Sequence, residues 1–500
     1  MITLIKLDED LNSPVSRKWE VCDAFMSKEP SYDGRLFVGV SSTRIYCRPT
    51  CNAKTPKFEN CTFFRSAAEA EAAGYRPCLL CHPEQAPQPA QDGMQRSLGA
   101  RMAAMVCEHC SGKVDFAALA ARVGLPEADV REVFANERGV SPEDYLLSCR
   151  LLLAKALLTE SGLSFEEVAT ASGFDSEEQL VQLFKERYRL DVVKVRNGSR
   201  SKSKNHAGVI TLRLAYRQPY RFGQLLRFFS SRTIVGVEKV DEASYARTAR
   251  IPLGDEEACG WLKVEDEAKK SRLVLTMSKS LLPVVSQVAA RVRRQFDLDC
   301  DPIAVYKGIE GLNEVKPGAA VIGTRVPGVF DPFETSVRAV LGQQISVSAA
   351  NKLAWRILGA YGKPIDTPID GLDHVFITRE DVLGFEDIEK AFGELGVIKI
   401  RSRTILSIAQ LLKSGELSFA ADCQPEEQIE TLLGIKGIGP WSANYIAMRC
   451  MSYPDAFLET DAGIKHALPW YEPKKRLALA ESWRPWRSYA NICLWNSLSA

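Results

Sequence analysis

The sequence lacks any long run of apolar residues. Of its 500 residues 46% are hydrophobic and 25% charged, yet no stretch reaches the roughly 20 apolar residues that a membrane-spanning helix requires. The opening residues, MITLIKLDED, turn acidic after a short apolar start and do not have the layout of a secretion signal. We therefore expect a cytoplasmic protein with no membrane partner.

An excess of charge of either sign is also missing. The 64 Lys and Arg residues nearly balance the 63 Asp and Glu residues, which leaves a net charge of +1 at pH 7. This balance does not indicate a nucleic-acid-binding protein, so any such function must be argued from local features. The chain is too long for one ordinary core, and we expect roughly three or four domains.

Cysteine, in contrast, is abundant, with 14 residues. Without a secretion signal, metal ligation or burial explains cysteines better than disulfides do. Four of them, in YCRPTC and RPCLLC, have the spacing C-x3-C-x26-C-x2-C. Two close pairs of this kind can meet at one tetrahedral Zn²⁺. We predict one zinc ion, bound by Cys47, Cys51, Cys78 and Cys81.

Another close pair, Cys107 and Cys110 in CEHC, has no matching second pair in the sequence. We expect these two cysteines to lie on one helix and not to bind metal. Most of the remaining cysteines are scattered singly, which is typical of small core residues.

Two polar segments have the composition of linkers. They are QAPQPAQDGMQRS at residues 85–97 and RNGSRSKSKNH at residues 196–206. Together with the patterns described below, they predict domains at residues 1–85, 97–196, 207–325 and 326–500.

The predicted fold class is multidomain and mainly α, with α+β parts. Behind the small zinc domain, two stretches show a helix, a glycine break and a second helix, which is typical of paired helix-turn-helix units. They are LAARVGLPEADVREVFANERGVSP and EEVATASGFDSEEQLVQLFKERY, joined by a helix at residues 145–158. Farther on, VITLRLAY, YARTARIPL and SRLVLTMS indicate strands, SLLPVVSQVAARVRRQF indicates a helix, and helices dominate from residue 329.

Within this last part, a glycine-rich turn separates the helical segments EQIETLLGI and PWSANYIAMRC. This order predicts a helix-hairpin-helix motif. Gly434, Gly437 and Gly439 let the backbone approach another surface closely, and the N–H groups of such a turn suit a DNA phosphate. Asp461, in FLETDAGIK, follows shortly downstream.

The cysteine-bearing head resembles the N-terminal domain of the Ada methylphosphotriester-repair family, through YCRPTC and the run AAEAEAAGYRPCLLCHP. The helix-turn-helix pair resembles the AraC-type domain that follows in that family. The resemblance implies that Cys47 accepts a methyl group from a DNA methylphosphotriester, with zinc keeping its thiolate nucleophilic. It also implies that methylation raises DNA affinity by removing negative charge, and that promoter DNA and RNA polymerase are partners.

The two expected recognition helices, PEADVREVF and SEEQLVQLF, are unusually acidic for surfaces that face phosphates or guanine edges. Two interpretations therefore stay open. Either the domain binds a promoter through Arg131, Lys185 and Arg187, or it is a degenerate or partner-facing helical domain.

From residue 210 onward the chain resembles the helix-hairpin-helix DNA glycosylases, specifically the 3-methyladenine DNA glycosylase II (AlkA) family. The matching blocks occur in order: ITLRLAYRQPYRFGQLLRFF, DEASYARTARI, RVPGVFDPFETSVRAVLGQQISVSAANKL, GIGPWSANY and WRPWRSYA. The resemblance implies a monomer that hydrolyses the N-glycosidic bond of 3-methyladenine, 7-methylguanine and related alkylated bases in double-stranded DNA. It implies no cofactor for this reaction.

By the same resemblance, Asp461 is the catalytic carboxylate, which stabilises positive charge on the sugar as the base leaves. Asp461 also has the position of a helix N-cap, and the two roles can coexist. Glu459 is the nearest competing carboxylate but has no comparable match. Substrate-binding residues implied by the resemblance are the aromatic Trp441, Tyr445 and Trp486, which attract a flipped cationic base, and Gln344 at the wedge position.

Trp441 occupies the position at which bifunctional glycosylase/lyases carry a Schiff-base lysine, so the resemblance implies a monofunctional enzyme that uses water. Lys436 lies inside the hairpin turn and is misplaced for that role. The cysteine array of the iron–sulfur glycosylases and the PCHR motif of the Ada guanine methyltransferase are missing. The alternative for the whole chain is a transcriptional regulator of the alkylation response that binds DNA without excising bases.

Overall fold

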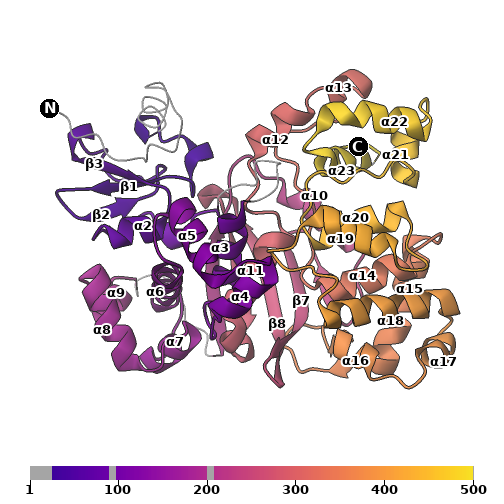
Figure 1. Ribbon diagram of the computed structural model, residues 1–500, viewed down its shortest axis with the longest axis horizontal. Helices are drawn as coiled ribbons and strands as arrows, with labels where there is room; N and C mark the ends of the chain where they lie inside the picture. The colour runs from indigo at the N-terminus through magenta and orange to yellow at the C-terminus, as the bar shows by residue number, and fades with distance from the viewer. Residues whose placement is uncertain (1–24, 89–96, 200–207, 499–500) are drawn as a thin grey trace. The chain divides into compact units, whose positions relative to one another are not determined.

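The computed structural model describes residues 25–88, 97–199 and 208–498 (Figure 1). The chain divides into two compact units. The first contains residues 1–90, 96–218 and 267–290, and the second contains residues 91–95, 219–266 and 291–500. Both units thus take strands from the segment 207–325. None of the described helices combines the length and apolar character that spanning a bilayer would require.

The first unit begins with a four-stranded sheet in the order β3-β1-β2-β4. Its strands are β1 (Phe37–Val40), β2 (Ile45–Cys47), β3 (Cys61–Phe64) and β4 (Arg76–Pro77). The short helix α2 (Ala67–Ala72) has Ser66 as its N-cap, and the Ser66 side chain accepts a hydrogen bond from Glu69 N. The core of this small domain is formed by Phe37, Tyr46, Phe64 and Tyr75. Cys47 is the last residue of β2.

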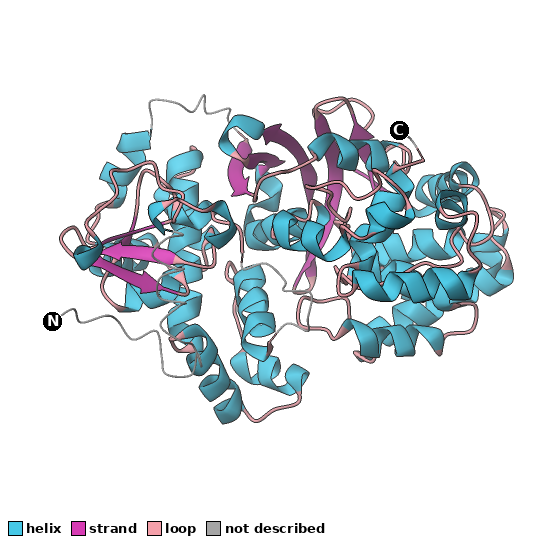
Figure 2. Ribbon diagram, turned by 90° about the horizontal axis from the view of Figure 1, so that it is seen from above, coloured by secondary structure: helices cyan, strands magenta, loops and turns pink. Residues whose placement is uncertain are grey.

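Helices make up the next part of the first unit, as the colours of Figure 2 show. They are α3 (Leu98–His109), α4 (Phe116–Val123), α5 (Glu127–Arg138), α6 (Pro142–Glu160), α7 (Phe165–Ala171), α8 (Glu177–Tyr188) and α9 (Val192–Ser199). The pairs α4–α5 and α7–α8, joined by the long α6, confirm the two predicted helix-turn-helix units. Gly124 ends α4 at a positive φ of 74°, a conformation that glycine adopts without steric strain.

The predicted linkers are only partly described. Helix α9 continues to Ser199, so the first residues of the segment 196–206 are helical, and residues 200–206 lie outside the described residues. In the segment 85–97, Gln85 is buried, and residues 89–96 lie outside the described residues.

The predicted strands are present as β5 (Val209–Ala215), β7 (Ser244–Leu253) and β9 (Arg272–Ser278). In the first unit, β5 pairs antiparallel with β9. In the second unit, β6 (Glu238–Val240), β7 and β8 (Glu256–Glu267) form an antiparallel meander. The predicted helix at residues 280–296 is a 3₁₀ turn at Lys279–Val284 followed by α11 (Val285–Gln295), which contains the boundary between the units.

The second unit is otherwise helical. Its helices are α10 (Phe222–Ser230), α12 (Pro302–Ile309), α13 (Leu312–Val315), α14 (Pro332–Leu341), α15 (Val347–Tyr361), α16 (Arg379–Leu383), α17 (Ile388–Gly393), α18 (Lys399–Ser414), α19 (Pro425–Leu433), α20 (Pro440–Cys450), α21 (Ala462–Ala467), α22 (Pro473–Ala480) and α23 (Arg487–Asn496). Val337, Ile405 and Ile446 hold α14, α18 and α20 together in one apolar core, and Leu458 and Leu494 belong to a second one.

A buried carboxylate joins the head to the helices of the first unit. Glu71 of α2 accepts hydrogen bonds from Tyr46 Oη (2.8 Å), Tyr188 Oη (2.9 Å) and Ser148 Oγ (2.6 Å). Because Ser148 lies on α6 and Tyr188 on α8, one side chain connects three elements. Burial raises the pKa of Glu71 to about 7, although all three hydroxyl groups act to lower it.

Replacing Glu71 with glutamine should therefore change the pH dependence of stability. Between pH 4.5 and about 7 the folded wild type keeps a proton that the unfolded chain releases, so its stability falls as pH rises. Glutamine keeps an acceptor for the tyrosines and a donor for Ser148 but does not ionise. We expect the unfolding free energy of Glu71→Gln, relative to wild type, to rise by about 3 kcal/mol across this range.

Chemical denaturation of both proteins at several pH values measures this difference. Glu59→Gln, at an exposed position of the same domain, serves as the control and should show a constant difference from wild type. A difference for Glu71→Gln that stayed constant or fell with rising pH would contradict the burial argument.

Candidate functional site

The four predicted zinc ligands come together in the head. The sulfur atoms of Cys47, Cys51, Cys78 and Cys81 all lie within 4.8 Å of one another. A tetrahedral zinc site with Zn–S bonds of about 2.3 Å places its sulfurs about 3.8 Å apart, so the cluster fits this metal. Cys51 and Cys78 are buried, whereas Cys47 and Cys81 are partly exposed. Cys47 and Cys81 are therefore accessible from outside.

Backbone N–H groups help to hold the thiolates. Arg48 N donates to Cys81 Sγ (3.4 Å), and Leu80 N donates to Cys78 Sγ (3.3 Å). The Arg48 side chain also lies here, and its Nε donates to Asp33 Oδ1 (2.8 Å). Burial alone would lower the pKa of Arg48, but Asp33 outweighs it, so the pKa is raised and the guanidinium stays charged beside the cluster.

The CEHC pair lies where the sequence predicts. Cys107 is in α3, and Cys110 caps its C-terminus. Among the described residues, the four-cysteine cluster is the only place where three or more metal-ligating side chains come together. Cys107 Sγ lies 2.8 Å from Cys149 Sγ of α6, and burial raises the pKa of Cys110 to about 12.

Asp461 is the N-cap of α21, and its carboxylate is held by three N–H donors. Oδ1 accepts from Ile464 N (3.1 Å) and from Trp495 Nε1 (2.8 Å), and Oδ2 accepts from Trp441 Nε1 (3.0 Å). Asp461 forms no ion pair with any described residue. One half-buried side chain therefore combines the capping role with a negative charge that no cation neutralises among the described residues.

Two stacked aromatic pairs flank this carboxylate. Trp441 and Tyr445 are one turn apart on α20, and their rings are almost parallel, 5.0 Å apart with an interplanar angle of 9°. Trp495 of α23 stacks on Phe228 of α10 at 6.1 Å and 20°. Because both tryptophans donate to Asp461, the carboxylate lies at the meeting point of the two pairs.

Asp461, Trp441, Tyr445 and Trp495 all line one cleft of about 1320 Å³ in the second unit. It is large enough for a flat organic ring together with part of the chain that carries it. Gln344 lies at its rim, exposed and with a positive φ of 56°. The predicted site residues that line the cleft are Gln344, Gly437, Gly439, Trp441, Tyr445 and Asp461.

Trp486 is not among them, which corrects its predicted role. Its side chain is 6% exposed and packs in the apolar core, edge-on to Tyr489 and against Gly308 of α12. The small cavity that it borders has about 30 Å³, far below the few hundred Å³ of a ligand pocket. Trp495, nine residues farther along, is the tryptophan that reaches Asp461.

The hairpin glycines differ in what they require. Gly437 has a φ of 98°, and a Cβ there would lie 2.4 Å from Thr404 Oγ1, so this position needs glycine. A Cβ at Gly439 would meet nothing within 4 Å, which leaves the start of α20 open to a partner. Gly434 ends α19 with an ordinary helical φ of −68° and does not line the cleft.

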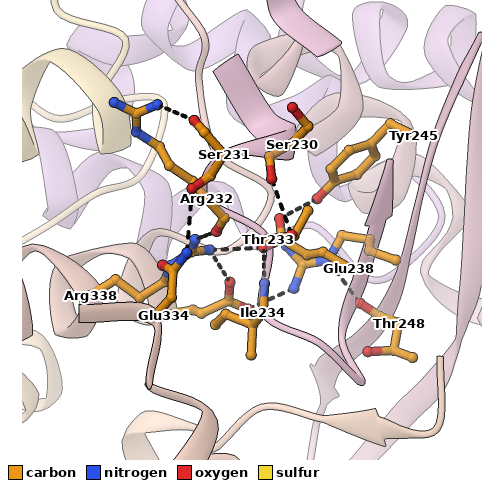
Figure 3. Close-up of polar contacts among 12 residues, drawn as sticks. Ser230, Ser231, Arg232, Thr233, Ile234, Glu238, Tyr245, Thr248, Glu334 and Arg338 are labelled. Carbon is orange, nitrogen blue, oxygen red and sulfur yellow. Dashed lines mark hydrogen bonds and ion pairs between the residues drawn. The ribbon is translucent and has the colours of Figure 1, made fainter. Parts of the chain in front are cut away.

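A network of buried charges lies in the wall of the cleft (Figure 3). Arg338 pairs with Glu238 (3.0 Å) and Glu334 (3.2 Å), while Arg247 donates to Glu334 (2.6 Å) and Tyr245 to Glu238 (2.7 Å). Burial alone would raise the pKa of Glu238, but Arg338 and Arg247 outweigh it and lower the pKa. The network fixes the relative positions of β6, β7 and α14.

Two arginines complete the aromatic site, and both were missed in the sequence. Arg449 Nη1 donates to Tyr445 Oη (2.7 Å), and Arg449 Nη2 donates to the Gly328 carbonyl (3.2 Å). The guanidinium groups of Arg232 and Arg449 lie 3.8 and 4.7 Å from the ring centroid of Phe228. Each arginine lies four residues after an aromatic residue that it contacts, Arg232 after Phe228 and Arg449 after Tyr445. This spacing was the signal available in the sequence, whereas the contact of Arg449 with Phe228 depends on the tertiary structure.

In the helical domain, two of the three basic residues considered for promoter contacts are already paired. Arg131 binds Glu127 (2.8 Å) and also Glu143, and Arg187 binds Asp144 (2.6 Å). Any phosphate contact through them would have to replace these carboxylates.

Comparison with known proteins assigns each part of the chain. Family models match the metal binding domain of Ada at residues 20–84, a helix-turn-helix domain at residues 119–197 and the AlkA N-terminal domain at residues 211–331. A probable bifunctional transcriptional activator/DNA repair enzyme AlkA of Mycobacterium tuberculosis is 32% identical over 490 residues, which cover 95% of each chain.

Two relatives from Escherichia coli match separate parts. DNA-3-methyladenine glycosylase 2 is 32% identical over 282 residues, covering 56% of this chain and 95% of its own. The bifunctional transcriptional activator/DNA repair enzyme Ada is 31% identical over 127 residues, covering 25% of this chain and 34% of its own.

The cysteine cluster predicts the metal content of the protein. Wild type should retain about one equivalent of zinc per chain after dialysis, and Cys51→Ser should lose most of it because a buried ligand is removed. Cys61→Ser, which replaces a buried cysteine outside the cluster, is the control and should retain the metal. Elemental analysis measures the content, and full zinc retention by Cys51→Ser would refute the ligand assignment.

Proposed function

The chain belongs to the family of bifunctional transcriptional activators and DNA repair enzymes of the AlkA type. We propose that it repairs alkylated DNA in two ways, through its second unit and through its N-terminal head. The second unit excises alkylated bases, and the head accepts methyl groups from DNA methylphosphotriesters. The observation that carries the excision is the Asp461 carboxylate, oriented by two indoles at the centre of an aromatic cleft.

Excision follows from what this site does to a flipped nucleotide. Alkylation of a purine ring nitrogen gives the base a positive charge, which the faces of electron-rich rings attract. Trp441, Tyr445 and Trp495 supply such rings. As the N-glycosidic bond breaks, positive charge develops on the sugar, and the Asp461 carboxylate stabilises it until water attacks.

We propose 3-methyladenine, 7-methylguanine and related alkylated bases in double-stranded DNA as substrates, and no cofactor for this step. A cationic base is already a good leaving group, so the site needs charge stabilisation more than acid catalysis. The indole of Trp441 occupies the place where a lyase would need an amine, which favours a monofunctional hydrolase. Gly437 and Gly439 would bring the hairpin N–H groups to a phosphate beside the lesion.

In the head, the partly exposed Cys47 would be the methyl acceptor. Its sulfur attacks the methyl carbon of a phosphotriester, a C–S bond forms, and the C–O bond breaks with its electron pair left on the phosphate. Zinc bound by the four cysteines would keep this sulfur a thiolate at neutral pH. Methylation removes one negative charge from the cluster, so the head is repelled less by DNA.

The helical domain would use this gain in affinity to act on transcription, with promoter DNA and RNA polymerase as partners of a monomeric, cytoplasmic protein. A regulator without glycosylase activity is the alternative. It explains the head and the helix-turn-helix pairs, but it gives no role to a carboxylate held between aromatic rings in a cleft of about 1320 Å³.

Asp461→Asn removes the charge and keeps the cap, because asparagine is an equally good N-cap. Its Oδ1 can still accept from Ile464 N and Trp495 Nε1, whereas its amide nitrogen replaces the oxygen that accepts from Trp441 Nε1. We expect single-turnover release of 7-methylguanine from duplex DNA to fall at least about 100-fold, with little change in thermal stability. Glu472→Gln, an exposed carboxylate on the neighbouring helix boundary, is the control and should keep wild-type rates. Retained excision by Asp461→Asn, or its loss in Glu459→Gln instead, would contradict the assignment.

Cys47→Ser should abolish methyl transfer to the protein, because a serine hydroxyl is not ionised at neutral pH and is a poor nucleophile. After incubation with methylphosphotriester DNA, peptide mass spectrometry should find one added methyl group on Cys47 in wild type and none in the variant. The control is Cys259→Ser, on β8 of the second unit. This variant should still gain one methyl group on Cys47. Methyl transfer to another cysteine of the cluster would show that the acceptor is misassigned.

A further inference from the structure

The loop between α14 and α15 holds Gln344 in an unusual conformation. Its φ of 56° lies in the left-handed region, which residues other than glycine adopt uncommonly. Such a conformation persists where the surroundings determine it. The contacts of the preceding residue, Gln343, show what these surroundings are.

The side-chain amide of Gln343 connects this loop to the hairpin. Its Nε2 donates to the carbonyl oxygen of Gly437 (2.8 Å) and to Ser442 Oγ (3.0 Å). Gly437 is the hairpin residue with positive φ, and Ser442 lies in the first turn of α20. Both amide protons are therefore used, one on each side of the point where the hairpin becomes a helix.

Helix α18 forms hydrogen bonds to both the α14–α15 loop and the hairpin. Arg401 donates to the backbone carbonyl of Gln343, and Thr404 Oγ1 donates to the Lys436 carbonyl of the hairpin (2.8 Å). The loop, the hairpin and α18 are thus joined by hydrogen bonds. Such a junction fixes where Gln344 stands relative to the hairpin.

We propose that Gln343 is a positioning residue that couples the hairpin to the wedge residue Gln344. Because of this coupling, binding of a DNA phosphate at the hairpin also places Gln344 in the space that the flipped base leaves. The inference rests on the proposed function. Flipping unstacks and unpairs the target nucleotide. A wedge side chain that fills the gap offsets part of the free energy of unstacking and unpairing. If the wedge is already held at a fixed distance from the bound phosphate, no entropy is lost in ordering it when the base flips.

Gln343→Glu is the most informative variant. Glutamate has the same shape as glutamine, but its carboxylate offers no donor to Gly437 O, so the connection should break while the packing stays. Gln410→Glu, at an exposed position on α18, adds the same negative charge away from the junction and should keep wild-type rates.

Two duplexes separate positioning from general damage to the protein. In the first, 7-methylguanine is paired with cytosine; in the second, it lies opposite an abasic site, where no partner base must be parted from it. Gln343→Glu should slow single-turnover excision at least about tenfold on the paired substrate and less than about threefold on the unpaired one. An equal loss on both substrates, or no loss on either, would overturn the proposal.

A double-mutant cycle provides a second test. If Gln343 acts through Gln344, the combination of Gln343→Glu and Gln344→Ala should be no slower on the paired duplex than the slower single variant. Independent, additive losses would contradict the coupling. If wild type excised neither substrate, the proposed glycosylase function would fail, an outcome distinct from both.

Discussion

The second unit is organised around a carboxylate whose hydrogen-bond partners are all neutral. Two indole N–H groups and one backbone N–H orient Asp461 without cancelling its charge. An arginine in the same place would form an ion pair and neutralise the carboxylate. In a cleft partly shielded from water, the remaining negative charge acts strongly on a positive charge that develops nearby.

Most other features of this unit place groups around that carboxylate. Helix α20 carries Trp441, Tyr445 and Arg449 at intervals of four residues, so one face of one helix provides the ring, its stacking partner and the arginine that fixes that partner. The hairpin immediately precedes this helix. The hairpin therefore has a fixed relation to the rings, and the contacts of Gln343 extend this relation to the loop at the rim.

The parts of the site that could be predicted from the sequence are those with fixed local spacing. The spacing of the two cysteine pairs predicts the zinc cluster, whose four sulfurs do come together. The roles of Trp441, Tyr445 and Asp461 came from the resemblance to the glycosylase family, and the i, i+4 spacing of the two aromatic residues places them on one face of α20. The tryptophans of α23 show the limit, because whether residue 486 or 495 reaches the cleft depends on how that helix packs. The contact of Arg449 with Phe228 likewise depends on tertiary structure, because the two residues lie on different helices.

The central claim concerns charge at the transition state, and a binding measurement tests it directly. Duplex DNA in which the target nucleotide is replaced by a pyrrolidine cation imitates the positive sugar without a bond to break. Wild type should bind this duplex at least about 100-fold more tightly than Asp461→Asn does, since transition-state analogues draw on the interactions that catalysis uses. Equal affinity of the two proteins for the cationic duplex would contradict the account.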